Sequence, residues 1–365
     1  TKKNLPVIQQ DKPIEWEAAQ GTRVEIELEA VYQKGRRSVD DYVEQTALAN
    51  PHVAIVYSPP RDEPKPYARV TSELPKESVE IKPHPYGVEL GVLLRMVKET
   101  QAKNLRGMLT AEFSRVSPAV ATEICRLAGL KPEAVPARLS GPQVESIFRA
   151  IADVRILAPP TACLSPIGEQ LLGQGLEQRI GADFSTAVTR PPAVYRGNPF
   201  QVEVGLSYGG ALSAEEPVEL YRYANRVPLQ YQQSACAISK AAVSIDWKKY
   251  GLQQARGALP VAPMILFVHI ASVWVPFTSE SKEAVASYPE ILKEIRLGLM
   301  EAGRRLGVFV RRRRRESDEH KKRTYIEKYI PHIGDALQEI LGLSDERRDK
   351  TVENLKLILE RSRKV

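Results

Sequence analysis

The residues best suited to binding chemistry lie in one basic and aromatic segment, Ser244 to Pro260 (SIDWKKYGLQQARGALP). Its candidates are two aromatic residues, two lysines and one arginine: Trp247, Tyr250, Lys248, Lys249 and Arg256. Lysines suit a phosphate backbone, an aromatic ring can stack on a base or contact a groove, and a glycine after Arg256 allows close approach to a phosphate. The segment therefore predicts a nucleic-acid contact displayed at the mouth of a sheet. A solvated connection whose Trp247 packs at an edge is the alternative.

No catalytic set can be assembled from the sequence. The five histidines are scattered, and no Walker-type GxxxxGK[ST] loop occurs. The three cysteines, Cys125, Cys163 and Cys236, lie far apart without a CxxC pair, and no histidine spacing suits zinc. We expect no metal site, no disulfide framework and a reducing compartment. If the protein takes part in ATP chemistry, most of the nucleotide site must lie elsewhere.

The net charge of +7 is concentrated in one region. Residues 301–330 contain eleven Lys or Arg and five acids, a balance of +6. Within them, Arg311 to Arg315 is an unbroken run of arginines, and Lys321, Lys322 and Arg323 follow. Such a density favours nucleic acid or an acidic partner, and a solvated helix face is the alternative.

Length and composition indicate a globular protein of two or three domains, since the chain has 365 residues and is 43% hydrophobic. No apolar run reaches the roughly 20 residues that span a bilayer, so we expect a soluble protein without a membrane partner. The chain begins at Thr1 rather than Met, without a signal-like stretch, and is expected to be a fragment or a processed product.

The elements that position these residues begin with Thr22 to Val31, where apolar and charged residues alternate and predict a half-exposed strand. A basic turn at 33–37 precedes a helix that Ser38 opens and that runs through Ala49. His52 to Tyr57 is a second predicted strand. Pro59 to Pro85 is rich in Pro, Lys and Glu and marks a linker.

The middle of the chain contains residues that typically begin and end short helices, and such helices are predicted at 88–100, 105–113, 117–127 and 140–152. Their scattered arginines and lysines resemble a helix-turn-helix class of nucleic-acid module. An ordinary helical bundle with surface arginines is the alternative.

Strands dominate after Gly173, with candidates at 201–208, 218–223 and 264–275. Together with Ala235 to Ile245 they complete an α+β domain. From Glu290 onwards, apolar residues recur at spacings of three and four and predict one long helix with a single apolar stripe. Helical patterns continue to the C-terminus, with expected interruptions at Pro331 and Gly342.

Long strings spread through the chain resemble the B subunit of type IIB DNA topoisomerases, the topoisomerase VI family. They are GTRVEIELEAVYQKGRRSVDDYVEQTALANPH (Gly21 to His52), KPHPYGVELGVLLRM (Lys82 to Met96), EFSRVSPAVATEI (Glu112 to Ile124), ANRVPLQYQQSACAISKA (Ala224 to Ala241), SIDWKKYGL, and VWVPFTSESKEAVA (Val273 to Ala286). The resemblance covers essentially the whole chain in the family's order.

The resemblance implies an α+β fold in successive parts. Residues 1–66 would be the C-terminal end of a GHKL-type ATPase domain and its sheet, and 67–172 a helix-two-turns-helix domain with linkers. Residues 173–289 would be an α/β transducer domain, and 290–365 its long stalk helix with the C-terminal helices.

The same resemblance implies an incomplete nucleotide site. The family's magnesium-coordinating Asn motif, adenine-binding Asp-Gly motif and Gly-rich lid have no match here, and only Gly21 and Thr22 match its last small nucleotide-site motif. ATP and Mg²⁺ would thus belong to the full-length subunit, and this chain would neither bind nor hydrolyse ATP unaided. Arg256 stands where the family normally has a lysine that reaches the γ-phosphate, with Lys248 or Lys249 as the fallback.

The implied DNA contacts are in three places. Lys34, Arg36 and Arg37 match a basic KGRR loop, and Trp247, Lys248 and Tyr250 match the WKxY element. The helix-two-turns-helix region supplies a third surface, for which we select Lys103, Arg106 and Arg115. Lysine and arginine contacts of this kind give sequence-tolerant, salt-sensitive affinity.

The implied function is passage of one DNA duplex through a transient double-strand break in another. ATP would make the B subunits homodimerise through the ATPase domain, and the transducer and stalk would carry that closure to the A subunit. The nucleophilic tyrosine and the magnesium site lie in that A subunit, so no residue here is assigned a catalytic role. A cytoplasmic, nucleoid-associated location follows.

Two other functions stay open at this point. One is a non-catalytic scaffold, similar to the B subunit, in a DNA-break-forming complex, which full-length nucleotide motifs would distinguish from an enzyme. The other is an RNA-binding module of the ribosomal helix-two-turns-helix kind, which does not explain the flanking strands or the stalk.

Overall fold

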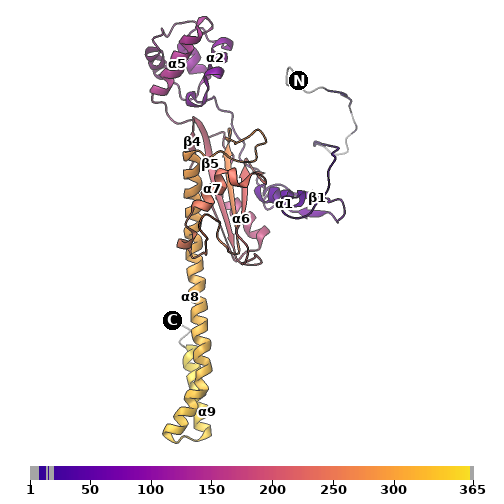
Figure 1. Cartoon of the computed structure of the whole chain (residues 1–365), viewed down its shortest axis with the longest axis vertical. Helices are drawn as coiled ribbons and strands as arrows, with labels where there is room; N and C mark the ends of the chain where they lie inside the picture. The colour runs from indigo at the N-terminus through magenta and orange to yellow at the C-terminus, as the bar shows by residue number, and fades with distance from the viewer. Residues whose placement is uncertain (1–7, 14, 16–19, 362–365) are drawn as a thin grey trace.

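The computed structural model describes residues 8–13, 15 and 20–361. Figure 1 shows a helical module at one end of the molecule, a sheet in the middle, and a long helix that carries the chain to the other end. The N-terminal segment lies to one side of the sheet. Among the described helices, none combines the length and the apolar character needed to cross a membrane.

The strand predicted from Thr22 to Val31 does not form. Residues 21–34 pair with no other strand, and the side chains of Val24, Ile26 and Leu28 are each at least 69% exposed. An isolated strand leaves its backbone N–H and C=O groups without a ladder, and no described strand pairs with this segment to supply one. The alternating pattern was therefore insufficient for a strand.

The predicted helix that follows is confirmed as α1 (Val39–Ala49), with Asp41 N donating to the Oγ of the N-cap Ser38. The second strand is shorter than predicted, because β1 begins only at Ile55 (Ile55–Tyr57). It pairs antiparallel with β2 (Lys65–Tyr67), which lies within the expected linker.

The helical module has the four helices that the sequence predicted: α2 (Leu90–Glu99), α3 (Leu105–Glu112), α4 (Pro118–Leu127) and α5 (Gly141–Asp153). Side chains of Asn104, Ser117 and Ser140 cap the last three. The four helices share one core of fully buried apolar residues, among them Leu93, Leu105, Met108, Ile124 and Ile147.

The central sheet has the strand order β3-β5-β8-β6-β7, with β4 also paired to β5. Its strands are β3 (Phe184–Thr189), β4 (Ala193–Tyr195), β5 (Asn198–Tyr208), β6 (Glu219–Ala224), β7 (Val227–Pro228) and β8 (Met264–Ser272). All pairs are antiparallel except β6 with β8. The sheet thus confirms the predicted α+β character and adds β3, β4 and β7, which were not predicted.

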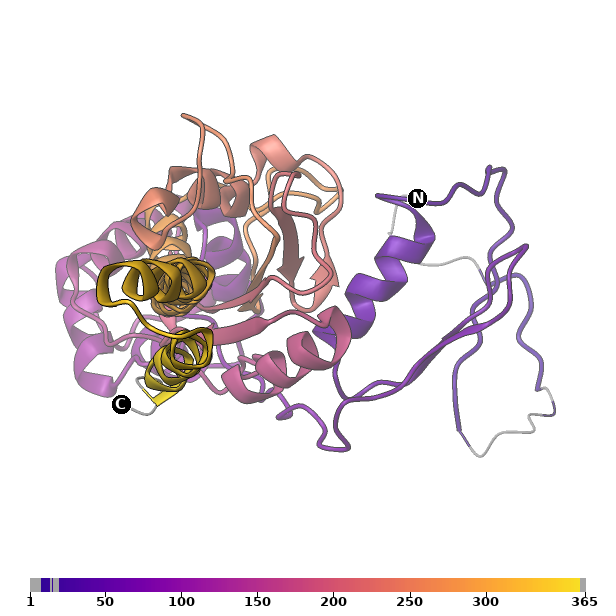
Figure 2. The same ribbon diagram turned by 90° about the horizontal axis from the view of Figure 1, so that it is seen from below.

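Helices cover both faces of this sheet. Alternate residues of β5 and β8, including Val204 and Val268, pack against α7 (Ala237–Ser244) and α8 (Pro289–Leu341). The intervening residues face α6 (Glu169–Ile180) and α1, which lie close together in Figure 2. The predicted domain boundary at Leu172 falls inside α6. Because α6 packs on the sheet, the part of the chain that forms the sheet domain begins before this helix.

A buried carboxylate ties the segment before α6 to the sheet. Glu203 on β5 is fully buried, and its oxygens accept hydrogen bonds from Ile167 N (2.8 Å), Gly168 N (2.7 Å) and Thr189 Oγ1 (2.9 Å). His269 Nδ1 lies 2.8 Å from Glu203 Oε2. Burial alone would raise the pKa of Glu203, but the hydrogen bonds from His269 and the two backbone amides lower it.

The imidazole of His269 is fixed from its other side. Arg226 N donates to Nε2 (3.0 Å), so Nδ1 is the nitrogen that carries a proton toward Glu203. Arg226 and Asn225 form the two-residue turn between β6 and β7, both with positive φ. The Arg226 guanidinium donates to Pro166 O (2.9 Å), so the turn also holds the segment that precedes α6.

The helical module meets the sheet at the turn between β4 and β5. Gly197 has φ 72°, and a Cβ on it would lie 2.7 Å from Gly87 N and 3.0 Å from His84 Nδ1. A Cβ on Gly87 would lie 2.7 Å from Arg196 O. Two glycines therefore allow a close backbone contact between the module and the sheet.

The predicted apolar stripe of the long helix is confirmed, since Ile295, Leu299, Ala302 and Leu306 of α8 are fully buried against the sheet. With 53 residues, α8 is about 80 Å long. It continues through Pro331, where an interruption was expected, and ends at Gly342 in the left-handed conformation. The returning helix α9 (Asp345–Arg361) packs against its last turns and supports them.

Candidate nucleic-acid interface

Trp247 does not lie at the surface that the sequence predicted for it. Its side chain is 0% exposed, and its Nε1 donates to Ala242 O at 2.9 Å. A buried ring with a satisfied N–H has no free face for a base, because the sheet core surrounds it. Trp247 is therefore corrected from a direct DNA contact to an anchor of the short 3-10 helix Trp247–Tyr250.

Tyr250 packs on α8. Its half-buried ring lies over Gly303, where a Cβ would come within 2.5 Å of Tyr250 Cε2, and its backbone is close to Gly307. The rings of Trp247 and Tyr250 meet edge to face with centroids 6.0 Å apart. The aromatic members of the segment thus hold it against the long helix.

The two lysines between these rings are the exposed members. Lys249 Nζ lies 3.6 Å from Asp246 Oδ2, whereas Lys248 has no ion pair within the described part of the chain. Lys248 is consequently the residue of this element best placed to meet a phosphate.

Gln254 fixes the rest of the segment, and sequence reasoning missed it. Its Nε2 donates to Ile245 O (3.0 Å) and Ala258 O (2.9 Å), and its Oε1 accepts from Trp247 N (3.0 Å). These bonds close the loop that presents Arg256, whose side chain is exposed. An amide that satisfies several backbone groups leaves no periodic signal in a sequence.

The basic loop before α1 is held by carboxylates. Lys34 forms an ion pair with Asp62, which raises the pKa of the lysine. Arg36 Nη2 lies 2.8 Å from Glu216 Oε2 and 2.9 Å from Glu219 Oε1. These acidic partners were not predicted, since up to 183 residues separate them from the loop.

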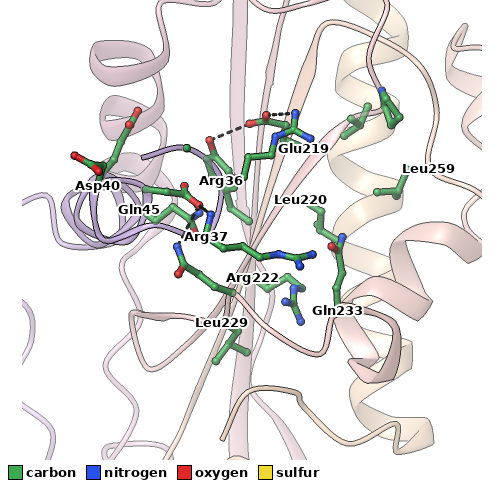
Figure 3. A pocket seen from close by; sticks show the side chains of 17 residues that line it. Arg36, Arg37, Asp40, Gln45, Glu219, Leu220, Arg222, Leu229, Gln233 and Leu259 are labelled. Atoms are coloured by element: carbon green, nitrogen blue, oxygen red, sulfur yellow. Dashed lines mark hydrogen bonds and ion pairs between the residues drawn. The ribbon is translucent and has the colours of Figure 1, made fainter. Parts of the chain in front are cut away.

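Arg37 differs from its neighbours. Its backbone has φ 63°, and its N–H donates to Asp41 Oδ2 at 2.9 Å. Its side chain has no ion pair among the described residues, and Figure 3 shows it reaching into a pocket beside Arg222. The loop therefore offers one uncommitted guanidinium.

The residues selected in the helical module lie apart from both elements. Lys103 and Arg106 are exposed at the start of α3, whereas Arg115 has φ 59° and its Nε donates to Ala158 O at 3.0 Å. Arg115 thus holds the segment that leaves the module. Figure 1 places the module at the opposite end of the sheet from the stalk, so the predicted contacts form separate surfaces.

The arginine run surrounds α8 where it leaves the sheet. Arg313 pairs with Asp183, and Arg312 Nε lies 2.9 Å from Glu316 Oε1. Five consecutive residues at about 100° each cover the whole circumference of a helix. The arginines of this run therefore point in all directions around the stalk and do not form one basic face.

The described residues do not assemble a nucleotide site. Gly21 and Thr22 lie in the exposed, unpaired segment, and no described contact joins them to Arg256. Within the described ranges, no group of three His, Cys, Asp or Glu side chains could hold a metal ion. We therefore derive no chemical step through ATP or Mg²⁺ from these residues.

The fold and its exposed basic elements define a class: an α+β protein in which a helical module and a long stalk flank one sheet. Residues 159–322 match the family model described as Topoisomerase VI B subunit, transducer. This match begins before α6, as does the part of the chain that forms the sheet domain.

Comparison with curated proteins extends this similarity to nearly the whole chain. The B subunit of type 2 DNA topoisomerase 6 is 43% identical in Methanococcoides burtonii (93% of this chain, 55% of the relative) and 42% identical in Archaeoglobus fulgidus (96% and 58%). The relative of the same name from Thermococcus gammatolerans is 36% identical (90% and 65%). Residues 159–322 therefore belong to the transducer family of the topoisomerase VI B subunit, and the chain is similar to that subunit over nearly its whole length. It spans about half the length of the first two relatives.

Proposed function

We propose that this chain contacts duplex DNA and transmits conformational change along its stalk, as part of the B subunit of an ATP-dependent type IIB DNA topoisomerase. The transducer match and the similarity to topoisomerase VI B subunits over 93% of the chain support this function. The observation that carries it is the packing of Tyr250 on Gly303 of α8. Through this contact, the short helix Trp247–Tyr250, which presents Lys248, lies directly on α8. A force on that element is then transmitted to a rigid rod about 80 Å long.

In this proposal, Lys248 and the loop Lys34–Arg37 bind phosphates without reading sequence. Such contacts suit an enzyme that passes one duplex through a break in another, because crossings and bends occur at any sequence. Lys103 and Arg106 form a third surface on the helical module. Arg256 remains the candidate for sensing the nucleotide.

The proposal assigns the remaining chemistry to the rest of the assembly. ATP and Mg²⁺ are bound by the whole B subunit, which homodimerises around the transported duplex. The A subunit supplies the nucleophilic tyrosine and receives the stalk. A cytoplasmic, nucleoid-associated complex of two A and two B subunits follows.

The test is a charge reversal in the reconstituted heterotetramer. Replacing Lys34, Arg36 and Arg37 with Glu should weaken duplex binding and relaxation, and should flatten the dependence of log K on log salt concentration by about 0.9 for each lost phosphate contact. The matched control reverses three exposed lysines that we place in no site: Lys76, Lys82 and Lys293. Equal duplex affinity and salt slope in the two variants would remove the loop from the proposal.

A further inference from the structure

A pocket of about 550 Å³ lies between the start of α1 and the outer edge of β6. Residues 35–45 form one wall and Pro217–Arg222 the other, while 229–233 and Leu259 close its end. Strand β7 pairs with β6 at Tyr223 and Ala224, and Leu229 N donates to Arg222 O, so among the described residues only Glu219–Tyr221 of β6 lack a partner strand on this edge. Figure 3 shows the lining side chains.

The first chemical feature of the pocket is the guanidinium of Arg222. The residue is 3% exposed, and its Nη2 donates to Tyr231 O at 2.9 Å. Its Nη1 is buried without a hydrogen-bond partner, and no carboxylate pairs with it in the described part of the chain. A buried cation without a counterion is unfavourable, so an anion bound at this group would be stabilised.

The second feature is Arg37, whose guanidinium enters the same pocket next to Arg222 (Figure 3). The hydrogen bond from its backbone N–H to Asp41 holds the backbone from which the side chain extends. Two guanidinium groups that line one pocket repel each other, and an anion between them would offset that repulsion. Their planar forks match the oxygens of a phosphate, which can accept two parallel N–H bonds from each.

The acidic residues of the lining do not supply that anion. Asp41 accepts from Arg37 N, Gln45 and Gln230, and Glu219 is paired with Arg36. Asp40 accepts from the hydroxyl of Tyr32 and points away from the two guanidinium groups in Figure 3. Burial raises the pKa of Glu44, as do its acidic neighbours, which disfavours its ionised form.

We propose that this pocket binds a small phosphorylated molecule, with Arg37 and Arg222 as the two donors to its phosphate group. Apolar walls at Leu220, Leu229 and Leu259 would contact the remainder of that molecule. The depth of Arg222 favours a free phosphate group over the backbone of an intact duplex, whose phosphates stay at the protein surface. The site shares Arg37 with the proposed DNA-binding loop, but its second donor, Arg222, is not among the proposed DNA contacts.

The test titrates the full chain with inorganic phosphate and pyrophosphate, at ionic strength held constant with chloride, by thermal unfolding and calorimetry. Both anions should stabilise the protein relative to chloride. Arg37→Gln should raise the Kd about tenfold or more. Arg155→Gln, which removes an exposed arginine outside the pocket, should leave it within about twofold. Absence of phosphate-dependent stabilisation, or equal affinities in the two variants, overturns the proposal.

Arg222→Lys keeps the buried charge and removes the fork, and it should weaken phosphate binding while retaining the native circular dichroism spectrum. If that variant does not fold, the comparison of Arg37→Gln with Arg155→Gln decides alone. A parallel titration with a short duplex distinguishes the source of the phosphate. Weaker duplex binding by Arg222→Lys with unchanged affinity for inorganic phosphate would assign the pocket to DNA and overturn the proposal.

Discussion

Glu203 and His269 stand directly opposite each other on the antiparallel strands β5 and β8, with Glu203 Oε2 2.8 Å from His269 Nδ1. Both side chains are fully buried. The carboxylate also accepts the backbone N–H groups of Ile167 and Gly168, where the chain enters α6. One buried pair therefore joins the middle of the sheet to the segment that arrives from the helical module.

Replacing Glu203 with Gln should destabilise the fold by about 3 kcal/mol at neutral pH, because the amide cannot accept from all the donors that face the carboxylate. The lowered pKa of Glu203 gives the sign of the pH dependence. Its contribution is present above about 4.5, the usual value for Glu, and is lost as the pH falls through the lower folded pKa. Urea unfolding between pH 7 and pH 3 checks this, and the wild type and variant should converge at the acidic end. The exposed Glu77→Gln is the control, and a difference that stays constant with pH would contradict the assignment.

Replacing Gly303 with Ala should destabilise the protein, although alanine is the better helix former by up to about 1 kcal/mol. The new Cβ would lie 2.5 Å from Tyr250 Cε2, and such overpacking typically costs about 1–3 kcal/mol. Gly91→Ala in α2 is the matched control, since no atom lies within 4 Å of its added Cβ, and it should stabilise. Chemical denaturation of both variants decides. Stabilisation by Gly303→Ala would show that Tyr250 does not pack on α8 in solution.

Trp247 and Lys248 should separate stability from DNA binding. Trp247→Ala empties a fully buried site and should cost about 3–5 kcal/mol, whereas Lys248→Glu changes an exposed residue and should leave stability within about 0.5 kcal/mol. Lys248→Glu should nevertheless weaken duplex binding. Thermal unfolding and a duplex titration at several salt concentrations measure the two effects. A Trp247→Phe variant that stays stable and loses duplex affinity would restore the tryptophan as a direct contact.

Elements whose causes are local were predicted from the sequence. The caps Ser38, Ser117 and Ser140 determine where three helices begin, because a side-chain oxygen meets a backbone N–H only a few residues away. The segment 22–31 shows the limit, since its alternation is correct for a strand but the required partner strand cannot be seen in the segment itself. Helix α6 was missed because Gly173 and Gly175 interrupt its apolar pattern.

For the candidate site, the sequence predicted the types of side chain but not the partners that each of them binds. The basic character of the loop 34–37 could be predicted, but its carboxylate partners could not, because Glu216 and Glu219 are brought to it by the sheet. Burial of Trp247 likewise depends on α8, which begins more than 40 residues later. Nothing in the sequence distinguishes Arg222 from the other residues of its strand, and only the structure shows that its Nη1 is buried and unpaired.

Neutralising the acids that hold Arg36 should strengthen DNA binding. In the wild type, a phosphate competes with Glu216 and Glu219 for this guanidinium, and exposed ion pairs of this kind contribute little to stability. The double variant Glu216→Gln, Glu219→Gln should therefore fold normally and bind a duplex more tightly at low salt. Its log K should fall more steeply with log salt concentration, by about 0.9 if one phosphate contact is gained.

Fluorescence anisotropy with a short duplex at about 50 to 200 mM salt measures this effect, and adding Arg36→Gln to the double variant is the control. The added substitution should return both the affinity and the slope to the wild-type range or below, since Arg36 is the group released. A gain of affinity that persists without Arg36 would instead reflect the change in overall charge, which acts at long range and needs no particular arginine.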